Sequence, residues 1–163
     1  MHRLAPFLSL ALAHLAACNP CTVPDSLQPG AVVARAGGSR WQAKDGIWFE
    51  EGTNVSIESE STDGWAISIV ATMTDDGTAA SEALAAEEFP IEFTVADAGA
   101  GAWALATPTL GGPLTSADAP EAGYLTIANR QEDDLLGCFA FDAGTGENTV
   151  SFVNGTFRIP ERH

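Results

Sequence analysis

The chain has 163 residues, and its 22 Asp and Glu against 7 Lys and Arg give a formal net charge of −15. A surface this acidic repels phosphate backbones and anionic lipid headgroups, which excludes nucleic acid as a partner and means that membrane contact needs another source. The length corresponds to one domain with a sizeable core.

Residues 1–17 have the composition of a cleaved export signal. The short charged start ends at Arg3, and an apolar run follows from Leu4 to Ala17. Fourteen helical residues reach about 21 Å, whereas a membrane-spanning helix must cross roughly 30 Å of hydrocarbon. The sequence therefore predicts a signal peptide over residues 1–17 and disfavours a retained membrane span.

The end of this run, Leu15-Ala16-Ala17-Cys18, resembles the lipobox of bacterial lipoproteins. The resemblance implies that Cys18 is diacylated, that it becomes the first residue of the mature chain, and that the lipid holds the protein on a membrane of the cell envelope. By the same analogy, Asn19 after the cysteine favours the outer membrane. The alternative is an ordinary secretory signal with an incidental thiol at Cys18.

Residues 18–30 form the predicted lipidated tether, and residues 31–163 the predicted β-domain. The tether carries three prolines and one glycine without any periodicity. Each proline fixes its own φ and favours an extended conformation of the residue before it, so a semi-extended linker is expected.

Two further cysteines remain if Cys18 is acylated. Cys21 and Cys138 are an even pair in a compartment that permits disulfides, and a bond between them is one reading. In the other reading, Cys138 is a small buried hydrophobe within an apolar run and Cys21 is a free thiol.

Strand-like alternation dominates the chain from residue 31 onward. Apolar side chains recur at every second position in several runs, among them residues 55–59, 65–69, 89–95 and 149–159. A period of two is typical of half-buried strands, and pairs such as Asp45-Gly46 mark turns between them. The pattern predicts an all-β fold: a single antiparallel β-sandwich or barrel-like domain of about eight short strands.

Two segments depart from this alternation. Residues 79–88 are rich in alanine and follow a candidate N-cap at Thr78, which predicts a short helix, with a flexible loop as the alternative. The pair Asn154-Gly155 fits either a hairpin turn or a bulge inside the last strand pair.

The inventory of side chains argues against an enzyme. Only His163 remains after the signal is removed, so a Ser-His or Cys-His pair has no ordered base. Carboxylates that share a sheet face are one route to glycoside hydrolysis, but nothing in the sequence selects a pair. The candidates are Glu58, Glu60, Glu92 and Asp142.

Calcium and sugar are the small ligands for which the sequence offers candidates. Asp142, Glu147 and Asn148 place oxygen ligands on a tight loop, although turn chemistry alone accounts for such a loop. No other metal or cofactor is expected. The four tryptophans are expected in the core, with sugar stacking as the alternative for an exposed ring: Trp41, Trp48, Trp65 and Trp103.

From Trp41 onward the chain resembles a broad group of small all-β bacterial lipoproteins without an assigned activity. The matching motifs are Gly38 with Trp41, the run 137–141 (Gly-Cys-Phe-Ala-Phe), and the run 154–157 (Asn-Gly-Thr-Phe). The resemblance implies an all-β fold and a location in the cell envelope, and it implies no activity. We expect a non-enzymatic envelope module, structural or partner-binding, with a carbohydrate- or calcium-binding surface lipoprotein as the alternative. An envelope protein or a glycan is the expected partner.

Overall fold

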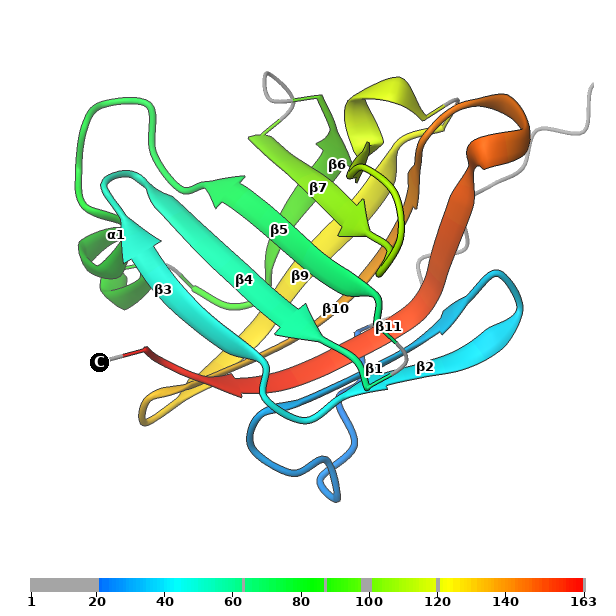
Figure 1. The fold of residues 1–163 in the computed structure, drawn as a ribbon. Coiled ribbons are helices and arrows are strands. Elements are labelled where there is room, and N and C mark those ends of the chain that lie inside the picture. Colours follow the sequence, from blue (N-terminus) through cyan, green and yellow to red (C-terminus); the bar gives the residue numbers. More distant parts are fainter. Residues whose placement is uncertain (1–20, 63, 87, 98–100, 120, 163) are drawn as a thin grey trace, which may run out of the picture.

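A computed structural model describes residues 21–62, 64–86, 88–97, 101–119 and 121–162. Strands dominate these residues, and one short α-helix accompanies them (Figure 1). The strands are β1 (Ala31–Ala36), β2 (Ser39–Ala43), β3 (Ile47–Glu51), β4 (Asn54–Glu60), β5 (Ala66–Thr72), β6 (Ile91–Ala96), β7 (Gly101–Thr107), β8 (Leu114–Thr115), β9 (Gly123–Gln131), β10 (Asp134–Ala143) and β11 (Val150–Pro160). The helices are α1 (Ala80–Ala86) and two 3₁₀ turns, η1 (Ser116–Asp118) and η2 (Gly146–Asn148).

The prediction of a β-rich fold with one short helix is confirmed, but the prediction of an antiparallel sandwich of about eight strands is wrong. The eleven strands of the described residues form one mixed sheet in the order β2-β1-β11-β10-β9-β6-β7-β5-β4-β3, with β8 added to β7. The pair β6–β7 is parallel. Short strands such as β2 and β8 have too few residues for alternation to reveal them, and alternation carries no information about strand direction.

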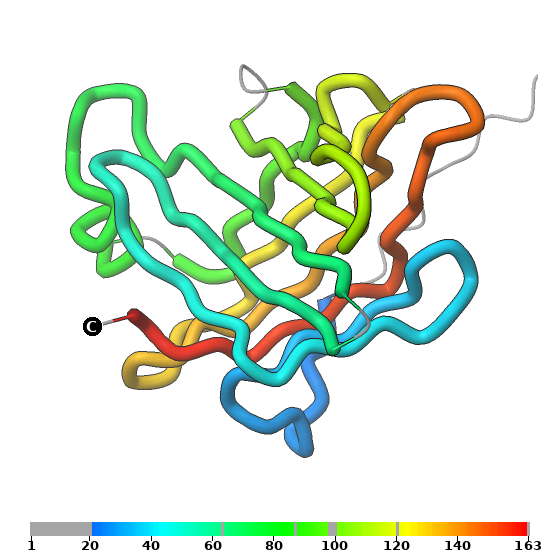
Figure 2. Tube along the Cα trace, in the orientation of Figure 1, coloured from blue at the N-terminus to red at the C-terminus, as the bar shows by residue number. Residues whose placement is uncertain are grey.

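The sheet curls until its last strand, β3, reaches the end of β11. The backbone N–H of Arg162 donates to the carbonyl of Trp48 at 2.8 Å, and Trp48 also forms a bridge with Glu161. The indole Nε1 of the fully buried Trp48 donates to the carbonyl of Asp133 at 2.9 Å. As a result, β3, β4, β5 and β7 lie in front of β9, β10 and β11, with the core between them (Figures 1 and 2).

The core follows from the alternation along each strand. Every second side chain of β4, β5, β7 and β10 points inward and is almost completely buried, while most of the side chains between them are half-buried or exposed. A cluster of aromatic rings fills the part under β10 and β11, with Phe141 stacked on Phe152 at a centroid distance of 5.0 Å. Burial of these large side chains supplies most of the driving force for the fold.

The motifs Gly-Cys-Phe and Asn-Gly-Thr-Phe turn out to face each other across β10 and β11. Gly137 is paired with Phe157, and Phe139 is paired with Gly155. Each ring therefore lies over a glycine of the neighbouring strand, where a Cβ would collide with the ring. The pair Asn154-Gly155 lies at an irregularity inside β11, so its bulge reading is confirmed and its hairpin reading is wrong.

The start of α1 is held by the β3–β4 hairpin. The amide of Ser81 donates to Oε2 of Glu50 at 2.9 Å, and the amide of Ala80 donates to the carbonyl of Gly52 at 3.0 Å. Thr78 does not supply the expected cap at this end. Its own amide donates to Asp76, and this hydrogen bond lowers the pKa of the Asp76 carboxyl.

No helix in the described part of the chain combines the length and the apolar character that crossing a membrane requires.

Candidate functional site: an acidic groove on the outer side of the sheet

The outward-facing side chains of β3, β4, β5 and β7 form a surface that we call the groove face. Directly paired residues of neighbouring strands project from the same side of a sheet, so the strand register defines the rows of this face. One row is Phe49, Ser56, Val70 and Trp103, and the next is Ile47, Glu58, Ser68 and Leu105. The face is therefore a mixture of half-buried apolar side chains and carboxylates.

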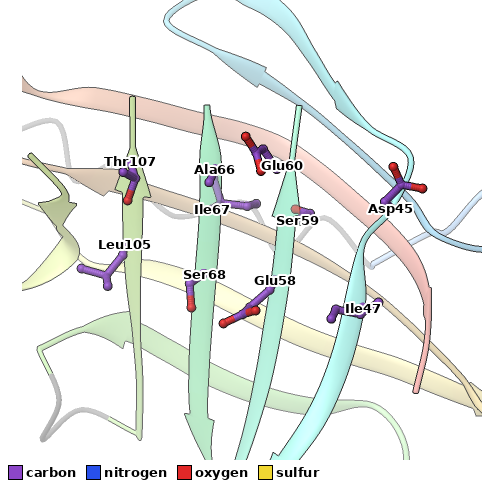
Figure 3. Close-up of a pocket in the computed structure, with 10 residues that line it drawn as sticks. All are labelled: Asp45, Ile47, Glu58, Ser59, Glu60, Ala66, Ile67, Ser68, Leu105 and Thr107. Carbon is purple, nitrogen blue, oxygen red and sulfur yellow. The ribbon is translucent and has the colours of Figure 1, made fainter. Parts of the chain in front are cut away.

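An open groove with a volume of about 370 Å³ crosses this face. Its apolar walls include Ile47 of β3 and Leu105 of β7, which lie on either side of Glu58 and Ser68 (Figure 3). Glu60 lies at the end of β4, and Asp45 lies in the turn before β3. The groove therefore has apolar side walls and three carboxylates along its length.

None of these carboxylates is neutralised within the described residues. No Lys or Arg nitrogen of that part lies within 4.0 Å of Asp45, Glu58 or Glu60. Asp45 and Glu60 are exposed, and Glu58 is half-buried. Three carboxylates that line one groove repel each other in the absence of a cation, so the groove favours a positively charged occupant.

The distribution of basic residues along the chain reinforces the negative charge of the groove face, and the motifs considered above do not reveal this distribution. Residues 45–129 contain fifteen Asp and Glu but not one Lys or Arg. This segment includes every strand of the groove face. The acidic residues alone look scattered, and the informative signal was the absence of positive charge between Lys44 and Arg130.

The four tryptophans divide between the core and the groove face. Trp41 and Trp48 are buried, and Trp65 packs against Phe152 at a centroid distance of 6.2 Å. Trp103 instead lies half-buried on the groove face, two residues before Leu105. Of the rings that sequence reasoning singled out, this one has the placement that sugar stacking requires.

The four carboxylates considered for glycoside hydrolysis do not come together. Glu58 and Glu60 both line the groove, but Glu92 lies on β6 and Asp142 on β10. Glu60 is exposed and Glu58 only half-buried, so neither has the apolar enclosure that a general acid of this chemistry usually has.

The calcium candidates lie at the β10–β11 connection. Asp142 is half-buried near the end of β10, and Glu147 and Asn148 are exposed in η2. Among the residues that the structure describes, no three His, Cys, Asp or Glu side chains are placed to hold a metal ion.

Cys21 and Cys138 form a disulfide in the structure, with a Cα–Cα distance of 5.6 Å across 117 residues of sequence. Cys138 projects from the outer side of β10, because its neighbours Gly137 and Phe139 point into the core. Residue 21 is therefore fixed on the outer side of β10. Cys18, the predicted lipid attachment site, lies outside the described residues.

Comparisons of the chain with models of known protein families, with curated proteins and with solved structures found no match.

Proposed function

We propose that this chain is a lipid-anchored, non-enzymatic module of the bacterial cell envelope that binds a positively charged partner in the acidic groove. The single observation that carries the proposal is the groove itself: carboxylates without cationic partners, set between apolar walls. A lysine- or arginine-rich segment of an envelope protein fits both properties, because long basic side chains combine an apolar stem with a charged end.

The proposed anchor is a lipid on Cys18, and its test is metabolic. Radiolabelled palmitate is expected to label the wild-type protein and not the Cys18→Ala variant. Equal labelling of both proteins would show that the lipobox assignment is wrong. An ordinary export signal would leave both proteins unlabelled and released from the membrane.

Binding of a decalysine peptide tests the groove. The double variant Glu58→Gln/Glu60→Gln is expected to weaken binding by about thirtyfold, since each of the two lost charge contacts costs on the order of 1 kcal/mol. The matched control is Glu82→Gln/Glu88→Gln, which removes the same charge from exposed positions in and just after α1. Isothermal titration at two salt concentrations gives the affinities.

Two results would count against this assignment. Equal loss of affinity in both double variants would mean that the peptide senses only net charge and not the groove. Affinity that does not fall with rising salt would contradict an electrostatic mode of binding, because exposed charges are screened over about 8 Å at physiological ionic strength.

A glycan is the second candidate, and Trp103 is the observation that favours it. A sugar ring stacked on this indole would change its fluorescence, and Glu58 and Ser68 offer hydrogen-bonding groups in the neighbouring row. Titration with soluble cell-wall oligosaccharides distinguishes the two candidate partners. A fluorescence change that is absent in Trp103→Ala and does not depend on salt concentration supports a glycan.

A further inference from the structure

The outer side of β2, β1, β11 and β10 forms a second surface, which we call the tether face. The strand register places Cys138, Thr156 and Val33 in one row of this face. Two residues further along β1, Arg35 is paired with Arg40 of β2 on one side and with Val153 of β11 on the other. Because side chains two positions apart share a face, these residues lie on the same face as the disulfide, on the β11, β1 and β2 side of it.

The β1–β2 part of the tether face carries the opposite charge to the groove face. Arg35 and Arg40 are exposed, and no carboxylate of the described residues lies within 4.0 Å of either guanidinium. Of the carboxylates on this side, Asp134 is paired with Arg158 at 2.7 Å. Asp142 and Glu121 line a shallow pocket together with Val153 of β11, and Glu92 of β6 is exposed in the same row as Cys138, so the positive charge is confined to the β1–β2 part of the face.

Two of the three most exposed large hydrophobic side chains lie on the same side of the sheet. Val153 is 40% exposed beside Arg35, and Tyr124 is 43% exposed on β9. Both border a shallow pocket with Ala140 of β10. Apolar and tyrosine side chains next to arginines are the composition of surfaces that lie at a lipid headgroup layer.

The disulfide determines how far this face can be from a lipid on Cys18. Only three residue steps separate Cys18 from Cys21, a reach of about 10 Å at full extension. Without the disulfide, the chain would be free up to the start of β1, and the reach would be about 40 Å. The disulfide therefore shortens the free chain between the lipid on Cys18 and the folded domain, and this short segment starts at Cys138 on the tether face.

We propose that the tether face lies against an anionic phospholipid bilayer, with Arg35 and Arg40 at the lipid phosphates and the Cys21–Cys138 disulfide fixing this orientation. The proposal rests on the proposed lipidation of Cys18. The same arrangement directs the groove face away from the membrane, since β3, β4, β5 and β7 lie on the other side of the curled sheet from β10, which carries the disulfide (Figure 1). Repulsion between the lipid phosphates and the groove carboxylates Asp45, Glu58 and Glu60 favours the same orientation.

The test measures depth on vesicles with the mature, lipidated chain. A fluorophore is attached through Val153→Cys on the tether face or, as the matched position, through Glu60→Cys on the groove face. The vesicles contain phosphatidylglycerol, phosphatidylethanolamine and a lipid with a spin-labelled headgroup that quenches fluorescence at contact. A count of one free thiol before labelling verifies that the native disulfide is intact.

We expect the label at position 153 to be quenched at least twofold more than the label at position 60. Equal quenching at the two positions would overturn the proposal. Flotation of the vesicles is measured on the same samples. Protein that does not float shows that the anchor is missing, whereas protein that floats with equal quenching shows that only the orientation is wrong.

Two variants separate the contributions to the orientation. Arg35→Gln/Arg40→Gln is expected to reduce the difference in quenching between positions 153 and 60 while leaving flotation unchanged. The control is Arg162→Gln. The Arg162 guanidinium lies over the ring of Phe49, away from the tether face, so its loss is expected to leave the difference intact. Cys21→Ser/Cys138→Ser is expected to reduce the difference as well, because the longer leash lets the domain turn. An undiminished difference in both double variants would overturn the roles assigned to the arginines and the disulfide.

Discussion

In the β10–β11 pair, positions 137 and 155 tolerate glycine only, because a Cβ at either position would collide with an aromatic ring of the facing strand. The ring of Phe157 covers Gly137, and the ring of Phe139 covers Gly155 on the facing strand. The two short motifs thus have a common explanation: each supplies one glycine and one ring to a reciprocal contact. The contact between the two motifs therefore serves packing between β10 and β11, and it involves no reactive side chain.

Substitution of Gly137 tests this explanation. In Gly137→Ala the new Cβ meets the Phe157 ring and the carbonyl of Thr126, so the free energy of unfolding is expected to fall by about 1–3 kcal/mol. Chemical denaturation measures the change. Gly112→Ala, where a Cβ has open space, is the control and is expected to stay within about 0.5 kcal/mol of wild type. Similar values for both variants would show that the contact is unimportant.

Trp48 gives a second residue-scale prediction, because it is the side chain at the closure of the curled sheet. Trp48→Phe removes the indole N–H that donates to Asp133 and leaves a small void, so a loss of about 1–3 kcal/mol is expected. Trp103→Phe on the groove face should cost less than about 1 kcal/mol. A comparison of the two unfolding midpoints checks the difference, and equal midpoints would be inconsistent with a special role for Trp48.

At the scale of elements, α1 depends on the strand pair beside it more than on its own sequence. The helix has only seven residues, which is too short for stability in isolation. Its first turn is held by Glu50 of β3, and Leu84 and Ala80 are buried against the core. The alanine content predicted the helix, but a contact across 31 residues of sequence replaced the local cap at Thr78.

Replacement of Glu50 tests that contact. Glu50→Ala leaves the amide of Ser81 without its acceptor, and loss of such a cap typically costs about 0.5–2 kcal/mol. Amide hydrogen exchange should show faster exchange in residues 80–86 than elsewhere. Glu51→Ala, an exposed neighbour on the same strand, is expected to leave the exchange rates unchanged. Uniform acceleration over the whole chain would point to global destabilisation instead.

The limits of prediction from sequence also lie at this scale. Alternation along β4 and β5 identified strands because one face of each is buried, and alanine content identified α1. Strand order depends on contacts between distant residues, so neither the parallel pair β6–β7 nor the closure of β3 on β11 could be read from local patterns.

The candidate site was hidden for a related reason. Asp45, Glu58 and Glu60 lie on one groove only because β3 folds back on β4 and the turn before β3 brings Asp45 beside them. In sequence they are three acids among 22. The absence of Lys and Arg from residues 45–129 is the one sequence signal that points to the segment containing the groove.

At the scale of the whole molecule, the disulfide joins the first described residue to a central strand. A closed loop of more than a hundred residues is expected to contribute roughly 4–5 kcal/mol in the chain-entropy account of cross-links. Guanidinium unfolding with and without a reductant measures this contribution. The Cys21→Ser/Cys138→Ser variant should behave like the reduced protein, and identical midpoints for all three samples would contradict a stabilising bond.

The same bond decides where a mechanical load enters the domain. Tension applied to the N-terminal end of the chain reaches β10 through Cys138 before it reaches β1. β10 is hydrogen-bonded to β9 on one side and to β11 on the other, so it has to be torn out of the sheet between two neighbours. In the reduced protein the pull would fall on β1, which is next to the edge strand β2, and would peel the sheet from its margin. Single-molecule stretching should therefore record a higher rupture force in oxidising buffer than in reducing buffer.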